Sequence, residues 1–104
     1  MQIVETPVFT RRVTELLSHD GYRLLQAALL ARPDMGAVIV GTGGARKVRW
    51  SVDGRGKSGG VRAIYYHATL DGVIYMLLIF AKNEQENLSD AQKNALRKII
   101  SNLG

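Results

Sequence analysis

The chain has no cysteine and only two histidines among its 104 residues, and these shortages limit its chemistry. Without cysteine, a disulfide framework, a thiolate zinc site and cysteine catalysis are all excluded. His19 and His67 fall in different predicted elements, and the acidic residues are scattered along the chain. Metal ligands must converge on one point, so we expect no metal site and no cofactor.

A long hydrophobic run is also missing from the chain. The longest run, Val73–Ala81, has nine residues. A membrane-spanning helix needs roughly 20. Met1–Glu5 lacks the basic segment and the apolar run that begin a secretory signal peptide. We therefore expect a single cytoplasmic domain over residues 1–104 that makes no contact with a membrane.

Positive charge is concentrated in one stretch of 26 residues, Gly41–Tyr66. It contains six basic residues and one acid, so its net charge of +5 equals that of the whole chain. Seven of the eleven glycines lie in the same stretch. Such a composition is typical of a phosphate or nucleic-acid contact, although a solvated face that keeps a small protein soluble has the same composition. Because the charge is confined to one region, we favour the nucleic-acid interpretation.

The first third of the chain predicts a short strand and a helical hairpin. Gln2–Glu5 has the composition of a strand. Thr6-Pro7 then supplies an N-cap followed by proline at the first helical position. Ser18 is a second N-cap, and Pro33 ends the second helix because the residue before a proline leaves the α region. We predict the hairpin over residues 7–32.

The rest of the chain predicts three strands and a final helix. Apolar residues recur with a period of two after Gly36, and Asp71-Gly72 is a strong hairpin turn between two apolar runs. Ser89 and Gln92 form a capping box that opens the last helix. The predicted strands are 46–52, 61–69 and 73–82, the last of them central. This order predicts the α+β class, with the N-terminal strand and helical hairpin packed on a mostly antiparallel sheet.

The predicted strands bring basic side chains together. Lys47 and Arg49 lie two residues apart and so share a face, and Arg62 opens the next strand. Phe80 and Lys82 share a face at the end of the third strand. If the strands are neighbours, these side chains converge on one surface that holds a phosphate and stacks a base. Considered singly, Lys82 reads as a solvated strand end and Phe80 as a core residue.

Gly56-Lys57-Ser58 has the appearance of a phosphate-binding P-loop, but the context excludes one. The first glycine of that motif is replaced by Ser51, and a strand follows where a helix is required.

Three segments together resemble the RelE/HigB family of toxins from type II toxin–antitoxin systems. They are Gly41–Arg49, Gly59–Tyr66 and Phe80–Glu84, and the likeness extends over nearly the whole chain. The chain is most similar to the HigB-like branch. The likeness lies in a glycine pair followed by an arginine and an aromatic strand, and then in a strand that ends in Lys-x-Glu. The resemblance implies the RelE/ParE-like fold. It also implies a ribosome-dependent mRNA endonuclease that needs no metal, in which the 2′-hydroxyl attacks the adjacent phosphate.

The resemblance also implies roles for individual residues. Lys47, Arg49, Arg62 and Lys82 correspond to the catalytic cations, which stabilise the charge of the transition state. The best-known branch has arginine at Asn83 and tyrosine at Ser89, so the general base is left open between Lys47, Tyr66 and His67. Further contacts with RNA or the ribosome are expected from Arg46, Arg55, Lys57, Tyr66 and Phe80.

Two rival functions fit the same sequence. A ParE-like toxin shares the architecture but poisons DNA gyrase without cutting RNA, and a plain RNA-binding module has no activity at all. The converging cations favour cleavage over both. The expected partners are a cognate helix-turn-helix antitoxin, mRNA and the A site of the small ribosomal subunit, with operator DNA bound only through the antitoxin complex. An antitoxin gene beside this one would exclude the plain module.

Overall fold

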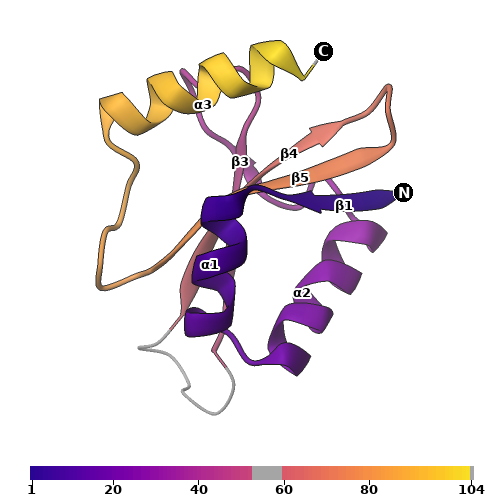
Figure 1. The fold of residues 1–104 in the computed structure, drawn as a ribbon, viewed down its shortest axis with the longest axis vertical. Coiled ribbons are helices and arrows are strands. Elements are labelled where there is room, and N and C mark those ends of the chain that lie inside the picture. Colours follow the sequence, from indigo (N-terminus) through magenta and orange to yellow (C-terminus); the bar gives the residue numbers. More distant parts are fainter. Residues whose placement is uncertain (53–59, 104) are drawn as a thin grey trace.

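A computed structural model describes residues 1–52 and 60–103 of the chain. Eight elements follow one another along the sequence (Figure 1). They are β1 (Gln2–Glu5), α1 (Pro7–Leu16), α2 (His19–Ala31), β2 (Ala37–Val38), β3 (Arg46–Trp50), β4 (Val61–Ala68), β5 (Val73–Ala81) and α3 (Asp90–Asn102).

The strands form one sheet in the order β1-β5-β4-β3-β2. Every neighbouring pair is antiparallel except β1 and β5, which run parallel. The α+β class and the mostly antiparallel sheet are therefore confirmed, and β5 is an interior strand as predicted. Strand β2 was not predicted, because its two residues are too short for a period of two to be visible.

The polar residues that open the helices act as the sequence predicted. The Thr6 hydroxyl accepts a hydrogen bond from the Phe9 N–H at 3.1 Å, and the Ser18 hydroxyl accepts one from the Gly21 N–H at 2.9 Å. At α3, Ser89 and Gln92 form a reciprocal capping box. These bonds satisfy amide groups that have no partner within the first helical turn, and so they fix where each helix begins.

The sheet separates two apolar clusters. Ala63 and Tyr65 of β4 point to one side, which we call the hairpin face, where they pack with residues of α1 and α2 such as Phe9 and Leu25. Ile64 of β4 points to the other side, the α3 face, where it packs with Leu96. Figure 1 shows the strands passing between α3 and the helical hairpin. Strand β4 is therefore covered on both faces, and its first five residues are all buried.

The turn after α2 is tied to the sheet through Tyr65, which is fully buried. Its hydroxyl donates to the Pro33 carbonyl oxygen at 2.7 Å and accepts from the Gly36 N–H at 2.9 Å. A Cβ at Gly36 would lie 2.9 Å from the Tyr65 ring and from the Lys47 carbonyl oxygen, so only glycine fits there. Arg46 adds two bonds, from Nη1 to the carbonyl oxygens of Gly36 at 2.7 Å and Asp34 at 3.2 Å.

We predict that Tyr65→Phe lowers the free energy of unfolding by about 1–3 kcal/mol, because it leaves the buried Gly36 N–H and the partly buried Pro33 carbonyl without their partner. Urea denaturation followed by circular dichroism measures the change. Tyr75→Phe is the matched control, since Tyr75 is only half-buried. Equal losses from the two variants would show that the hydroxyl of Tyr65 does not hold the turn.

Candidate nucleic-acid interface

Three side chains from three adjacent strands form a row on the α3 face. The register pairs Arg49 of β3 with Arg62 of β4, and Arg62 in turn with Phe80 of β5. Directly opposed residues on neighbouring strands lie about 5 Å apart at Cβ. The convergence expected for these three residues is therefore built into the hydrogen-bonding register of the sheet.

Arg62 is the unusual member of the row, because it is only 6% exposed. Its Nε is buried without a hydrogen-bond partner, and no carboxylate within residues 1–52 or 60–103 forms an ion pair with it. Arg62 is therefore not the exposed cation that its charge alone would suggest. Arg62 opens a strand that lies in the middle of the sheet, so the side chains of its cross-strand partners Arg49 and Phe80 flank its stem.

This arrangement is costly without a ligand. Like charges directly opposite each other on neighbouring strands destabilise a sheet, and a buried charge without a partner loses its hydration. An anion placed between Arg49 and Arg62 would remove both penalties. A phosphate suits the planar guanidinium in particular, because two of its oxygens can accept parallel hydrogen bonds.

Gly60 shapes one side of this site. Its φ of +134° lies in the region that favours glycine, and a Cβ there would lie 3.4 Å from the Trp50 carbonyl oxygen and 4.0 Å from Nη1 of Arg62. Its carbonyl oxygen accepts the Lys82 N–H at 3.1 Å. The backbone of Lys82 is thereby attached two residues before Arg62, and its exposed side chain follows directly after β5.

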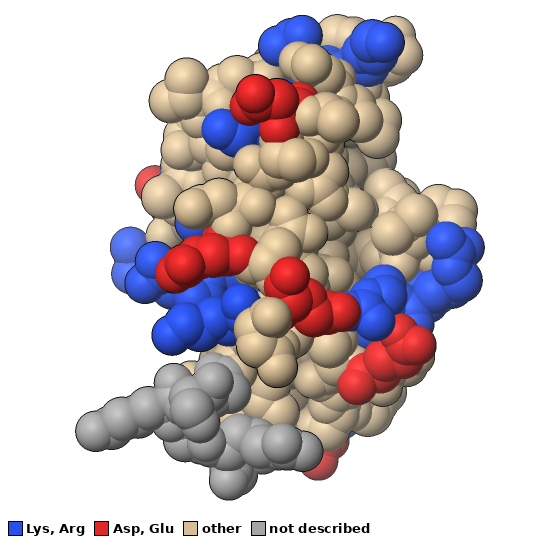
Figure 2. Space-filling view, turned by 90° about the vertical axis from the view of Figure 1, so that its left-hand side faces the viewer, with Lys and Arg blue, Asp and Glu red and all other residues tan. Residues whose placement is uncertain are grey.

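Lys47 completes a group of four cations, Lys47, Arg49, Arg62 and Lys82, that we call the cation cluster. It is half-buried, lies opposite Ile64 and shares the α3 face with Arg49. Figure 2 shows Lys and Arg side chains gathering toward the lower left of the molecule. Phe80, by contrast, is 6% exposed and belongs to the apolar cluster under α3, so little of its ring is free to stack on a base.

The other residues expected at the site are dispersed. Arg46 alternates with Lys47 and binds the turn after α2, as described above. His67 pairs with Ile74, a hairpin-face core residue, and so lies on the opposite side of the sheet from Arg62. Tyr66 shares the α3 face but lies four residues along β4 from Arg62, against Gly44. Arg55 and Lys57 lie outside the described residues.

The turn that follows β5 carries a second set of polar contacts, which no sequence pattern had indicated. The Glu84 carboxylate accepts the Ala81 N–H at 2.8 Å and pairs with Arg12 of α1. The hydrogen bond from the Ala81 N–H is the main cause that holds the pKa of Glu84 below its ordinary value, and the positive charge of Arg12 acts in the same direction. Glu84 is therefore a carboxylate at neutral pH, already engaged by α1.

Two further observations concern metal binding and membrane insertion. Within the described parts of the chain, no group of three or more histidine and acidic side chains is placed to hold a metal ion. No helix in those same parts has the length and apolar character to cross a membrane.

A family model described as the RelE toxin of the RelE/RelB toxin–antitoxin system matches residues 1–103. The match covers nearly the whole chain, so the chain belongs to this family of toxins. It is therefore the toxin component of a toxin–antitoxin system, and membership of the family implies a cognate antitoxin as its partner.

We predict that Arg62→Met raises the free energy of unfolding by about 1 kcal/mol or more, because methionine keeps an apolar stem in place and removes an unpaired buried charge. Arg46→Met is the matched control on the neighbouring strand. It should lower stability, since it abolishes two hydrogen bonds to the turn after α2. Urea denaturation in a buffer free of phosphate and sulfate measures both changes. Destabilisation by Arg62→Met would mean that the buried guanidinium has a stabilising partner.

Proposed function

We propose that this toxin is a ribosome-dependent mRNA endonuclease of the HigB-like branch. The observation that carries the proposal is the nearly buried Arg62, directly opposite Arg49, whose buried Nε has no hydrogen-bond partner. A toxin that acts only by binding another protein does not need a guanidinium held in the middle of a sheet at a cost in stability. An enzyme that must stabilise charge on a phosphate does, and stability sacrificed at a functional site is a common pattern.

The proposed reaction is an internal transesterification of the mRNA. The 2′ oxygen forms a bond to the adjacent phosphorus, and the bond from phosphorus to the 5′ oxygen breaks. The products are a 2′,3′-cyclic phosphate and a free 5′-hydroxyl. The 2′-hydroxyl loses a proton to a base, and the leaving 5′ oxygen gains one. No electron acceptor or other reactant enters, so the chemistry needs only positioned cations, a proton acceptor and a proton donor.

Three members of the cation cluster, Arg49, Arg62 and Lys82, supply the electrostatic part of this reaction. Arg62 is assigned to two non-bridging oxygens of the scissile phosphate, with Arg49 on the same oxygens from the opposite strand. Lys82, exposed at the end of β5, is assigned to the leaving 5′ oxygen, where negative charge develops. Cations held in place before the reaction stabilise the transition state more than the ground state, since the charge on these oxygens rises as the bonds change.

Lys47 is our choice for the proton acceptor, a role that its side chain fills as the neutral amine and not as the ammonium ion. It lies on the α3 face, two residues from Arg49. That separation is about 7 Å along a strand. Tyr66 lies four residues along β4 from Arg62, whereas Lys47 lies two residues from Arg49. His67 faces the other side of the sheet. Of the three residues that the sequence left open, Lys47 alone adjoins both arginines on their own face.

For the cleavage itself, we predict that Arg62→Met slows single-turnover cutting of ribosome-bound mRNA by about 10²–10³-fold, the scale for losing one transition-state donor. In vitro translation with primer extension on the mRNA locates and times the cuts. Arg23→Met, which removes an exposed cation from α2, should cut at the parental rate. Cutting by Arg62→Met at the parental rate would refute the phosphate assignment. Growth arrest by the parental toxin with no cut mRNA, but with poisoned gyrase, would refute the nuclease altogether.

The choice of base gives a separate prediction. Lys47→Met should lower the single-turnover rate by about 10²-fold or more, because general-base catalysis contributes on that scale. Tyr66→Phe should cut at the parental rate. Rates measured with ribosomes at saturation compare the two variants. A loss on that scale in Tyr66→Phe together with a parental rate for Lys47→Met would assign the base to Tyr66.

A further inference from the structure

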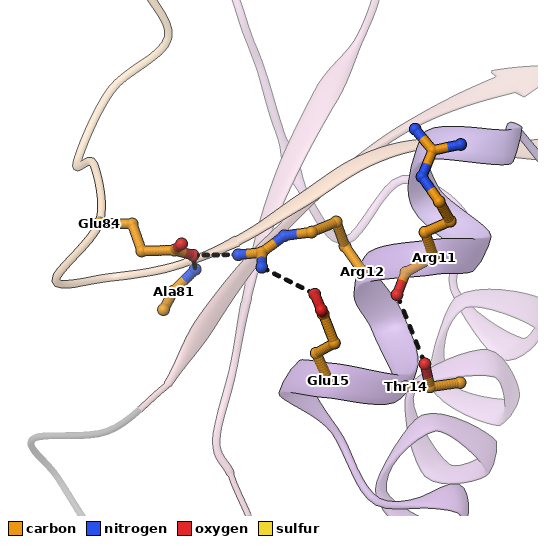
Figure 3. Close-up of polar contacts among 6 residues, drawn as sticks. All are labelled: Arg11, Arg12, Thr14, Glu15, Ala81 and Glu84. Carbon is orange, nitrogen blue, oxygen red and sulfur yellow. Dashed lines mark hydrogen bonds and ion pairs between the residues drawn. The ribbon is translucent and has the colours of Figure 1, made fainter.

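Helix α1 reaches the end of β5 through one arginine. Arg12 donates from Nη1 to Glu15 Oε1 at 2.9 Å and from Nη2 to Glu84 Oε1. Figure 3 shows the guanidinium between the two carboxylates, while the neighbouring Arg11 side chain points away from them. The Arg12 side chain is 33% exposed, and two acceptors fix both of its terminal nitrogens. These contacts restrict the guanidinium more than a single surface ion pair would.

The turn that Glu84 closes is the one that carries Lys82. The Glu84 carboxylate accepts the Ala81 N–H at 2.8 Å, and the Glu84 N–H donates to the Ala81 carbonyl oxygen at 3.0 Å. On the other side, the Lys82 N–H donates to the Gly60 carbonyl oxygen at 3.1 Å. The backbone of Lys82 is therefore held between β4 and the turn, and the turn is held by α1.

We propose that Arg12 and Glu84 are positioning residues for Lys82. Through the Arg12–Glu84 contact, α1 fixes the direction in which the chain leaves β5, and with it the direction of the Lys82 side chain toward the cation cluster. This inference rests on the proposed nuclease function. Neither residue touches the mRNA in this account, and both act through Lys82 alone. A displacement of about 1 Å at a reacting group lowers rates by up to about 10²-fold, so a surface contact of small energy has a large kinetic effect here.

The chain offers two matched controls for this inference. Arg11 adjoins Arg12 on α1 and is exposed, and Figure 3 draws no contact from its guanidinium. Glu15 pairs with the same arginine but does not touch the turn after β5. Arg12→Gln and Glu84→Ala should each slow single-turnover cleavage by about 10-fold or more at saturating ribosomes. Arg11→Gln should cut at the parental rate, and Glu15→Ala, which removes one of the two bonds that fix Arg12 but leaves the bond to Glu84, should slow cleavage less than Glu84→Ala. Ribosome affinity and the thermal unfolding midpoint should stay close to parental in all four variants.

The decisive measurement adds the Lys82→Ala substitution. If Arg12 acts only through Lys82, then Arg12→Gln costs nothing further in the Lys82→Ala background, because residues that act as one unit are not additive. A full additional loss in that background would show a general structural role and overturn the inference. Slow cleavage by Lys82→Ala with a parental rate for Arg12→Gln would also overturn it, while leaving the nuclease intact. Absence of any cleavage by the parental protein would instead refute the proposed function on which the inference rests.

Discussion

Strand β4 holds a guanidinium inside the sheet, and much of this structure is arranged around it. Arg62 is buried because β4 is the middle strand, with Arg49 opposite it on one side and Phe80 on the other. Two positive charges in this geometry repel each other, and in the described parts of the chain no carboxylate compensates them. The fold tolerates this repulsion because the apolar clusters on both faces of the sheet stabilise it and offset the free-energy cost of the arginine pair. In the proposed function an RNA phosphate is the partner of this pair, and its binding would relieve the repulsion.

The surrounding elements serve this centre in different ways. Gly60 leaves room beside the Arg62 guanidinium and binds the backbone of Lys82. Helix α1 contacts the turn that carries the same lysine, through Arg12 and Glu84. Tyr65, on the hairpin face of the same strand, secures the turn after α2. Helix α3 packs on Ile64 and Phe80, and so fills the part of the α3 face that the cation cluster does not occupy. The site therefore lies on strands and is supported by two helices, an arrangement that favours the fixed geometry which the proposed phosphoryl transfer requires.

Much of the fold followed from local signals, whereas the site depended on burial that such signals do not contain. Thr6, Ser18 and Ser89 marked three helix starts because N-capping is a local interaction. The period of two assigned Lys47 and Arg49 to one face. No such pattern shows that Arg62 is buried or that the Arg46 guanidinium binds the turn after α2. Both facts depend on which strands become neighbours. For the same reason, the sequence could not decide whether the Phe80 ring stacks on a base or packs in the core. The Arg12–Glu84 contact joins residues 72 positions apart, a separation beyond the reach of any local pattern.

The central claim is that Arg62 holds a phosphate of the RNA. The most direct measurement is the ¹H–¹⁵N NMR signal of the Arg62 Nε–H, assigned by its loss in Arg62→Met and followed during titration with a 2′-O-methyl trinucleotide that the toxin cannot cleave. This group has no hydrogen-bond partner in the free protein. We predict a saturable downfield shift that reports a new charge-assisted bond, while the Nε–H of Arg23 does not move. A signal from Arg62 that stays unchanged while other residues of the cation cluster respond would contradict the account.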